Sequence, residues 1–504
     1  MRESGILMPV SSLPGPYGIG CFGKEAFKFV DFLADAGQKI WQLLPLSPTG
    51  YGDSPYQSCS AFAGNPYFVD LEALEKEGLL TAADLKAESW GKDPLEVDYG
   101  TLYVSRFAVL RKAYAAWRSQ CAGLHGCAYY YPDDYYTFTL ANEDWLEDYA
   151  LYMACKRHFG MRSWTEWDDA DIRLRRSPEV LEQYRTLLRE DVELFTYLQF
   201  LFFRQWNRLR DYLHSLDIQV IGDLPIYVAM DSADVWAEPE MFQLDEHNVP
   251  TEVSGVPPDC FSEDGQLWGN PLYNYEAMAK DGFGWWIRRI GGAQKLYDVI
   301  RIDHFRGIES YWAIPAVNRT ARKGEWVKGP GMKLVNAIRK NCPDTDFIAE
   351  DLGFLTPEVQ QLVIDSGFPG MKVLEFAFDP REPSNYLPDR YPENSICYTG
   401  THDNETLIQW CEGIDVETDA YARNYLGITP EDDLADAIME AGMQSKAQLF
   451  IMQMQDYLRL GKESRMNEPG RLLPSNWRWR MLPGAANETL AKKIAGLTER
   501  SNRV

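Results

Sequence analysis

The sequence has no apolar run that approaches the roughly 18 residues needed to span a bilayer. Its start, MRESGILMPVSSLPGPYG, has only a few consecutive apolar residues before Ser and Pro, so a signal-peptide core is absent. The nine cysteines are odd in number and scattered, without a Cys-x-x-Cys pair, which argues against a disulfide framework and a zinc site. We therefore expect a soluble protein of a reducing compartment, the cytoplasm.

Positive charge is also scarce. Against 75 Asp and Glu there are 50 Lys and Arg, which gives a net charge of -25. Such a chain repels phosphate backbones and anionic lipids, so nucleic acid and membranes are poor candidate partners. Aromatic residues are frequent by contrast, at 13% with 16 Trp and 28 Tyr. Their rings suit the apolar faces of sugars, although they are also ordinary core residues.

The strongest fold signal is an alternation of apolar strands with amphipathic helices. Repeated βα units predict a parallel sheet covered on both faces, and polar residues at successive strand ends favour a closed (β/α)₈ TIM barrel of the α/β class. An open doubly wound sheet is the alternative, but no Gly-rich dinucleotide loop follows any predicted strand. Strands are predicted at residues 39–48, 218–223, 299–303, 346–353, 371–379 and 395–406, and the last barrel strand is expected near 455–460 or 480.

The remaining segments are expected to be loops and insertions within one catalytic barrel spanning residues 1–504. Residues 1–20 have the Gly and Pro content of a loop, and residues 447–460 have helical spacing. Residues 72–190 contain several amphipathic helices and predict a helical insertion subdomain. Residues 51–71 and 245–275 are rich in Gly, Pro and aromatic side chains, so we interpret them as irregular segments that face the substrate groove.

The stretch YDVIRIDHFRG, residues 297–307, predicts a buried strand that ends at the acid Asp303. Arg301 and Asp303 are two positions apart, so in a strand their side chains lie on the same face, about 6 to 7 Å apart at Cα. A guanidinium beside a carboxylate favours the ionised form, which makes Asp303 a candidate nucleophile. The alternative is that Asp303 caps the N-terminus of a helix, where Asp is favoured.

Other strand ends add carboxylates at Asp223, Glu350 and Asp403. In a barrel these acids would meet at one mouth, where several carboxyl groups close together are costly unless one is ionised while another is protonated. Retaining glycosyl transfer uses this difference in protonation: one carboxylate attacks the sugar, and a carboxylic acid about 5 to 5.5 Å away protonates the leaving oxygen. Glu350 follows an apolar strand that would raise its pKa, so we expect it to be the acid and later the base.

Residues next to these acids could have structural, sugar-binding or metal-binding roles. Asp351 is expected to be a cap or a structural partner, whereas His402 and Asn404 flank Asp403 and could donate hydrogen bonds to sugar hydroxyls. His402 with Asp403, or His304 with Asp303, could also form a carboxylate and histidine metal centre. However, His-x-His and His-Glu-x-x-His patterns are absent, and a cation at Arg301 would oppose a metal. We therefore predict no metal site.

RIDHFRG, EDLG and THDNET, in that order, resemble the 4-α-glucanotransferases of the amylomaltase, or disproportionating enzyme, type, which are related to the α-amylases. Similar segments cover nearly the whole chain, including GDSPYQSCSAFAGNPYF, IGDLPIYV, GVPPDCFSEDGQLWGNPLY and RMNEPG. The resemblance implies a barrel with helical insertions and no C-terminal β-sandwich, acting without a cofactor on an α-1,4-glucan donor and a saccharide acceptor. It also implies Asp303 as nucleophile, Glu350 as acid/base and Asp403 as transition-state stabiliser, with Asp223, Arg301 and His402 on the donor sugar and Tyr56, Gln266 and Trp268 along the groove.

Two departures from the family pattern lie in loops expected near the substrate. Cys260 stands where an aromatic residue is common, and residues 468–471 read Glu-Pro-Gly-Arg in place of Thr-Pro-Gly-Thr. Acceptor choice and chain-length preference are therefore open, as is the oligomeric state. An α-1,4-glucan hydrolase and a non-catalytic glucan-binding protein are the competing functional interpretations.

Overall fold

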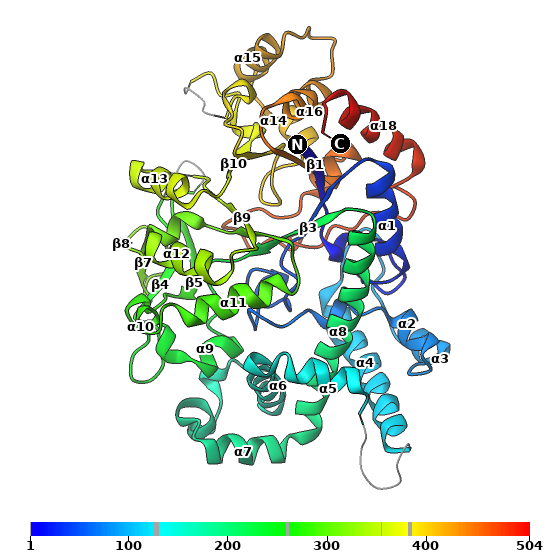
Figure 1. The fold of residues 1–504 in the computed structure, drawn as a ribbon, viewed down its shortest axis with the longest axis vertical. Coiled ribbons are helices and arrows are strands. Elements are labelled where there is room, and N and C mark those ends of the chain that lie inside the picture. The colour runs from blue at the N-terminus through cyan, green and yellow to red at the C-terminus, as the bar shows by residue number, and fades with distance from the viewer. Residues whose placement is uncertain (1, 124–130, 259–261, 354, 382–385, 504) are drawn as a thin grey trace.

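The chain forms a closed barrel of eight parallel strands, which confirms the predicted fold (Figure 1). The computed structural model describes residues 2–123, 131–258, 262–353, 355–381 and 386–503. Around the barrel the strands follow the order β1, β12, β11, β10, β9, β6, β3 and β2. Their bounds are β1 (Glu3–Leu7), β2 (Ile40–Gln42), β3 (Gln219–Leu224), β6 (Val299–Ile302), β9 (Asp346–Ala349), β10 (Gly370–Val373), β11 (Ser395–Tyr398) and β12 (Leu449–Gln453).

The barrel is filled by apolar side chains that point inward from successive strands. This interior cluster comprises Leu7, Ile40, Ile221, Val299, Ile348, Met371, Val373, Ile396, Tyr398 and Ile451. Aliphatic layers of this kind make a barrel interior a packed core. On β3, Gly222 allows the ring of Tyr297 to pack directly against the backbone, since a Cβ at this position would lie 2.0 Å from a ring atom.

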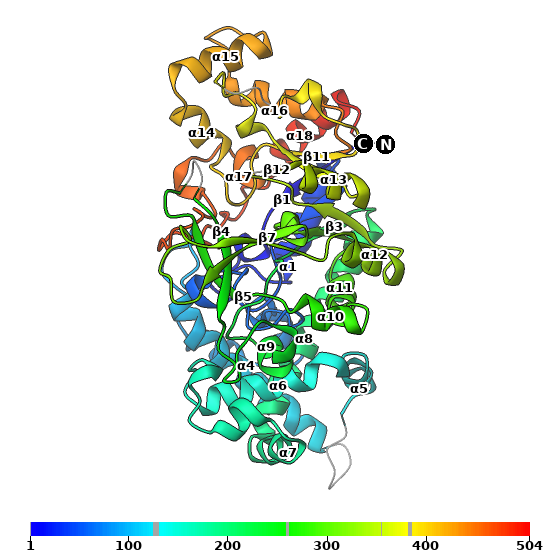
Figure 2. The ribbon, with the colours of Figure 1, turned by 90° about the vertical axis from the view of Figure 1, so that its left-hand side faces the viewer.

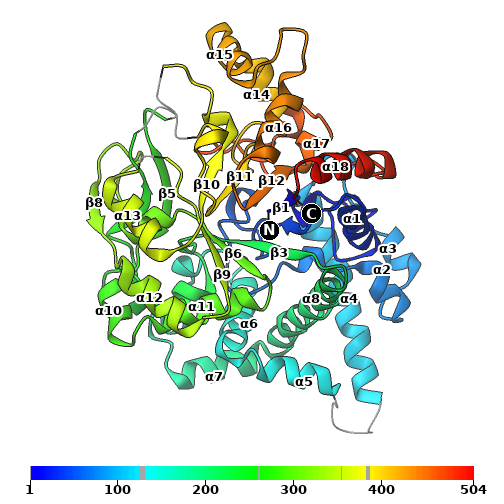
Figure 3. The same cartoon turned by 45° about the horizontal axis from the view of Figure 1, so that its top comes forward.

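Helices surround the strands, as Figure 3 shows. They include α1 (Lys24–Asp35), α8 (Arg189–Ser215), α11 (Gly284–Gln294), α12 (Met332–Asn341), α13 (Pro357–Ser366), α16 (Leu434–Gln444) and α18 (Glu488–Arg500). Shorter or outlying helices are α9 (Ala233–Ala237), α10 (Tyr275–Lys280), α14 (Leu407–Gly413), α15 (Val416–Leu426) and α17 (Met454–Tyr457). None of the described helices has the length and apolar character needed to cross a membrane.

Two barrel strands differ from the sequence predictions. Residues 1–20 were predicted as loop, but Glu3–Leu7 form β1, which pairs with β2 on one side and with β12 on the other. Residues 447–460 were predicted as helix, with a strand near 455–460 or 480, but the strand is β12 at Leu449–Gln453 and the short helix α17 follows it. Several other strands end earlier than predicted, so that Glu350 comes directly after β9.

The regular structure described between β2 and β3 is helical, apart from an isolated β-bridge at Glu96. It contains α2 (Leu71–Lys76), α3 (Ala82–Lys86), α4 (Tyr99–Gly123), α5 (Asp133–Leu140), α6 (Glu143–His158) and α7 (Pro178–Leu187), followed by α8. Helices α4 to α7 gather at one end of the molecule, at the bottom of Figure 1, and α6 packs extensively on α8. The long helix α8 therefore joins these helices to the barrel.

Residues 245–275 are more regular than predicted. They contain β4 (Glu252–Val256) and β5 (Gln266–Pro271), which join β7 (Ser310–Pro315) and β8 (Glu325–Lys328) in a four-stranded antiparallel sheet of order β5, β4, β7, β8 (Figure 2). Register along this sheet aligns Leu267, Gly255, Trp312 and Trp326. Gln266 and Trp268 lie on the face of β5 opposite to that of Leu267. Trp268 contacts His304, which follows the end of β6.

Candidate active site

Strands β3 and β6 bring together two acids and an arginine at the carboxyl end of the barrel. Their register pairs Asp223 with Arg301, so both side chains point into the barrel. Nη1 of Arg301 donates to both oxygens of Asp223, at 2.6 and 2.7 Å, and to Oδ1 of Asp303 at 3.1 Å. The predicted contact between Arg301 and Asp303 is present, but the stronger pair of Arg301 is the fully buried Asp223.

Glu350 is fixed by two backbone N–H groups. His304 donates to Oε2 at 2.7 Å, and Leu352 donates to Oε1 at 2.8 Å. The backbone of His304 is left-handed, with φ of +48°, a region that few non-glycine residues adopt. His304 is also the residue that precedes the short helix Phe305–Ile308. Asp303 is therefore not the cap of that helix, and its carboxylate remains available at the barrel mouth.

Asp403 follows β11 and is held by a loop distant in sequence. Nδ2 of Asn467 donates to Oδ1 of Asp403 at 2.6 Å, and Nη2 of Arg465 donates to its backbone carbonyl at 3.0 Å. Nε2 of His402 lies 3.4 Å from the same Oδ1. The oxygen of Asn404 accepts the N–H and O–H of Thr401, at 2.9 and 2.8 Å, and so closes the turn that contains Asp403.

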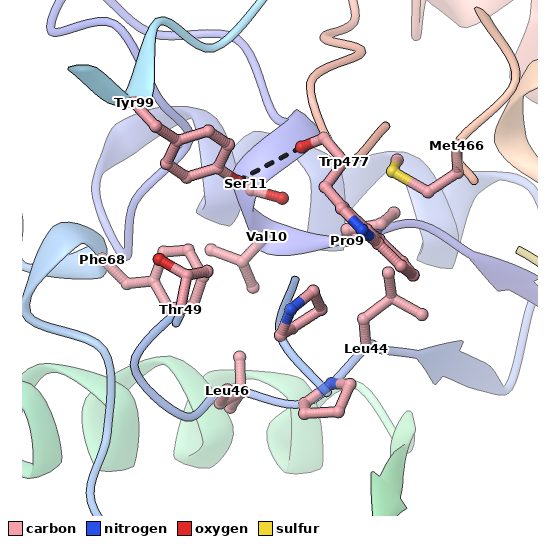
Figure 4. Close-up of a pocket in the computed structure, with 12 residues that line it drawn as sticks. Pro9, Val10, Ser11, Leu44, Leu46, Thr49, Phe68, Tyr99, Met466 and Trp477 are labelled. Carbon is pink, nitrogen blue, oxygen red and sulfur yellow. Dashed lines mark hydrogen bonds between the residues drawn. The ribbon is translucent and has the colours of Figure 1, made fainter. Parts of the chain in front are cut away.

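Aromatic side chains line one wall beside these acids. The hydroxyl of Tyr56 donates to Oδ2 of Asp223 at 2.7 Å, and its ring stacks on His402 with centroids 5.0 Å apart. Trp477 packs against both rings, at 5.6 Å from Tyr56 and 5.9 Å from His402. Trp477 also lines the pocket drawn in Figure 4, where the hydroxyl of Tyr99 donates to its carbonyl at 3.2 Å. This wall joins the loop after β2 to the loop after α17.

Trp268, one of the predicted groove residues of β5, lies beside the end of β6. The indole of Trp268 meets the ring of His304 edge to face, with centroids 4.8 Å apart, and its N–H donates to Oε1 of Gln266 at 3.2 Å. The structure thus brings Trp268 next to the residue that holds Glu350. Gly470 approaches Gln266 closely, since a Cβ on it would lie 3.5 Å from Cγ of Gln266. The loop at 468–471 therefore borders the same groove.

Burial dominates the electrostatics of the site. Desolvation raises the pKa of Glu350, in the direction predicted from its apolar strand, while Arg301 opposes the shift. Desolvation also raises the pKa of Asp303 well above its ordinary value; Arg301 opposes this shift, whereas Asp223, Glu350 and Asp403 add to it. Asp303 is therefore less readily ionised than its arginine neighbour alone suggested. Each of the two carboxyl groups disfavours the charge of the other, so they titrate as a pair.

Histidines at the site remain neutral. Desolvation lowers the pKa of His304 to about 3 and also lowers the pKa of His402. A neutral imidazole can donate one hydrogen bond and accept another, but it brings no positive charge near the carboxylates. Among the described residues there is no group of three or more His, Cys, Asp or Glu that could hold a metal ion.

Sequence reasoning missed several residues at the mouth. His304, Arg465, Asn467 and Trp477 contact predicted site residues, yet none was assigned a role; the motif RMNEPG, which contains Arg465 and Asn467, was the available signal. Asp351 is a structural partner, as expected, because Oδ1 accepts the N–H of Met371 at 2.6 Å. The predicted departure at Cys260 lies outside the described residues.

Known proteins resemble this chain over its whole length. Residues 8–485 match the family model described as 4-alpha-glucanotransferase. The 4-alpha-glucanotransferase of Streptococcus pneumoniae is 46% identical, with 100% of this chain and 98% of that protein aligned, and that of Thermus thermophilus is 45% identical over 100% and 99%. The structure of amylomaltase from Streptococcus agalactiae in complex with acarbose superposes with a TM-score of 0.94, at 42% identity and complete coverage of both chains. The chain therefore belongs to the 4-alpha-glucanotransferase family.

Proposed function

We propose that this enzyme cleaves an α-1,4 linkage in a glucan, holds the released segment as an ester on Asp303, and transfers it to the 4-hydroxyl of a second sugar. One observation supports this most directly: Asp303, Glu350 and Asp403 follow three different strands of one barrel, and Arg301 links the first to the buried Asp223. Two successive displacements at the anomeric carbon retain its configuration.

Each carboxyl group has a role that its contacts support. Arg301 donates directly to Asp303 and so favours negative charge there, and the proposed mechanism places the proton of the pair on Glu350 in the active form. Glu350 protonates the leaving oxygen and then removes a proton from the acceptor hydroxyl. Asp403 faces the donor sugar as an anion and stabilises the positive charge that develops on the ring.

The surrounding residues divide between donor and acceptor. Tyr56, Asp223, Arg301 and His402 form a connected polar and aromatic cluster, and we assign it to the donor sugar that is attacked. Gln266 and Trp268 lie on the insertion next to His304 and are assigned to the glucan chain on the acceptor side. An acceptor sugar bound there would limit the access of water, which favours transfer over hydrolysis.

The test is to incubate the protein with maltotriose, without added cofactor, and to resolve the products by length while free glucose and total reducing ends are measured. We expect longer maltooligosaccharides together with glucose, at constant total reducing ends. Shortening with a rise in reducing ends would instead identify an α-glucan hydrolase. Unchanged maltotriose would favour a non-catalytic glucan-binding protein and would overturn the proposal.

A further inference from the structure

The loop from Arg465 to Trp477 supplies a hydrogen bond to the proposed transition-state stabiliser. Nδ2 of Asn467 lies 2.6 Å from Oδ1 of Asp403, across 64 positions of sequence. Asn467 is only 9% exposed, whereas the side chain of Asp403 is 44% exposed, so a buried amide holds a carboxylate that remains accessible. A short hydrogen bond from a buried neutral amide to a carboxylate fixes the direction of the carboxylate without cancelling its charge.

A second residue fixes the distance between the two partners. The guanidinium of Arg465 donates from Nη2 to the carbonyl of Asp403 at 3.0 Å and from Nε to the carbonyl of Asn467 at 2.9 Å. One rigid planar group therefore bridges the backbones of both residues. Arg465 also lies 3.6 Å from Glu405, so its charge is balanced by a carboxylate other than that of Asp403.

The loop that contains Asn467 is itself held in place. The N–H of Trp477 donates to the carbonyl of Met466 at 2.7 Å. Asn476 accepts the N–H of Glu468 at 3.3 Å and donates to the carbonyl of Arg471 at 2.9 Å. These bonds close the loop on itself and make no contact with Asp403. Asn467 is therefore the residue of this loop whose side chain holds the carboxylate of Asp403.

We propose that Asn467 is a positioning residue for the transfer reaction: it orients the carboxylate of Asp403 toward the charge that develops on the donor sugar. This inference rests on the proposed function. Because Asn467 engages Oδ1, the second oxygen of Asp403 remains free to face the sugar ring. The benefit of this orientation is greatest in the transition state, where the positive charge appears, so its loss lowers kcat more than it changes KM.

The experiment compares Asn467→Ala and Asn467→Asp with the control variant Asn341→Ala, in maltotriose disproportionation by the full chain. Asn341 is an exposed residue at the end of α12, and its Nδ2 donates to the carbonyl of Ala337 in the same helix. Asn467→Ala should lower kcat about 10- to 100-fold, as expected for a lost hydrogen bond to a charged group, with KM changed less than about threefold. Asn341→Ala should keep kcat within about threefold of the parent protein. Circular dichroism and Tm confirm that each variant is folded.

Asn467→Asp gives a signature that a merely structural role would not produce. At high pH it places a second anion against Asp403, so its activity should fall below that of Asn467→Ala. At low pH the introduced carboxyl group is protonated and donates a hydrogen bond, so the activity ratio of Asn467→Asp to Asn467→Ala should rise as pH falls from about 8 to 5. The charged and titratable groups around this position are Asp403, Arg465, Glu405 and His402, whose Nε2 lies 3.4 Å from Oδ1 of Asp403. Both variants keep these four groups, so the ratio of their activities isolates the introduced carboxyl group.

Two outcomes would overturn the inference: a ratio that stays constant with pH, or equal losses in Asn467→Ala and Asn341→Ala. Failure of the proposed function is distinguishable, because the parent protein would then make no longer oligosaccharides from maltotriose. If the parent transfers glucan segments while Asn467→Ala matches it in kcat, only the positioning role fails.

Discussion

The backbone N–H of His304 donates to Oε2 of Glu350 at 2.7 Å, and His304 adopts φ of +48° where it makes this bond. The residue after the proposed nucleophile therefore holds the proposed acid. This arrangement fixes the two carboxyl groups relative to each other through a single turn of backbone. An L-residue in the left-handed region is under strain, and such strain often occurs where a site must hold a defined geometry.

The alkaline limb of activity should follow the coupled carboxyl pair of Asp303 and Glu350. Desolvation raises the pKa of both groups, so kcat/KM should fall on the alkaline side as the pair loses the proton that Glu350 donates. His304 has a pKa of about 3 and is neutral throughout the range in which Glu350 titrates. The alkaline limb should therefore keep its position in His304→Asn, measured as glucose release from maltotriose across pH. Disappearance of that limb in His304→Asn would assign it to the imidazole instead.

Asp303→Asn should abolish transfer while leaving the fold intact. The amide is nearly isosteric but is not a nucleophile, so we expect a loss of about 10³-fold or more in kcat. Tm and circular dichroism should match those of the parent protein. Asp168→Asn is the control, since Asp168 is an exposed partner of Arg162. Near-normal transfer by Asp303→Asn would exclude Asp303 as the nucleophile.

Tyr56→Phe removes one hydrogen bond to a buried carboxylate. Desolvation raises the pKa of Tyr56 well above 10, so its phenol remains a donor to Asp223 at every working pH. We expect kcat/KM to fall about tenfold or more, because a hydrogen bond to a charged group is lost while the ring stack on His402 remains. Tyr212→Phe, which removes a phenol donated to Asp31 on the surface, should leave kcat/KM unchanged and serves as the matched control. Equal activity in both variants would contradict the assignment of Tyr56 to the donor cluster.

Gly222→Ala should destabilise the barrel. The new methyl group would lie within 2.2 Å of three ring atoms of Tyr297, and overpacking of this kind costs about 1 to 3 kcal/mol or more. Gly413→Ala is the matched control because a Cβ at Gly413 has no neighbour within 4 Å. Gly413 ends α14, where alanine also favours the helix, so this variant should be neutral or slightly stabilising in urea or thermal unfolding. A higher Tm for Gly222→Ala would show that Tyr297 moves aside readily.

Asp456 should make the fold less stable as pH rises. Burial raises its pKa from 3.8 to about 6, so the folded chain binds a proton more tightly than the unfolded chain. Stability is then greatest below about pH 4, falls as pH rises to about 6 and is constant above it, a total of about 3 kcal/mol for this group. Asp456→Asn removes the titration, and its unfolding free energy should vary correspondingly less between about pH 4 and 6. An unchanged pH dependence would show that Asp456 is already ionised at low pH.

The elements that sequence reasoning located correctly are short strands made mostly of apolar residues. VIRI, DFIA and SICY are short and flanked by polar residues, and their ends placed Asp303, Glu350 and Asp403 at one mouth. The first strand, ESGIL, was missed because Ser4 and Gly5 weaken its apolar pattern. Gly5 is needed there, since a Cβ would lie 2.4 Å from Cβ of Ile40 on the neighbouring strand.

Other features depended on contacts that no local pattern reveals. Only Gln453 separates the apolar run of β12 from Met454, where α17 begins, so periodicity could not separate strand from helix. The pairing of Arg301 with Asp223 rather than chiefly with Asp303 follows from strand order in the barrel. Asn467 meets Asp403 only because a C-terminal loop folds back over the mouth.

The seam between β1 and β12 has a consequence for folding. Glu3 pairs with Leu449, so the two strands that complete the barrel come from nearly opposite ends of the chain. Contacts so distant in sequence form slowly, since a large loop must close before they contribute. During synthesis, β1 leaves the ribosome before the other barrel strands, and β12, its partner on this side, leaves after all of them. Until then one edge of the parallel sheet is open and can pair with another chain, so we expect nascent or slowly refolding chains to be most prone to aggregation at this seam.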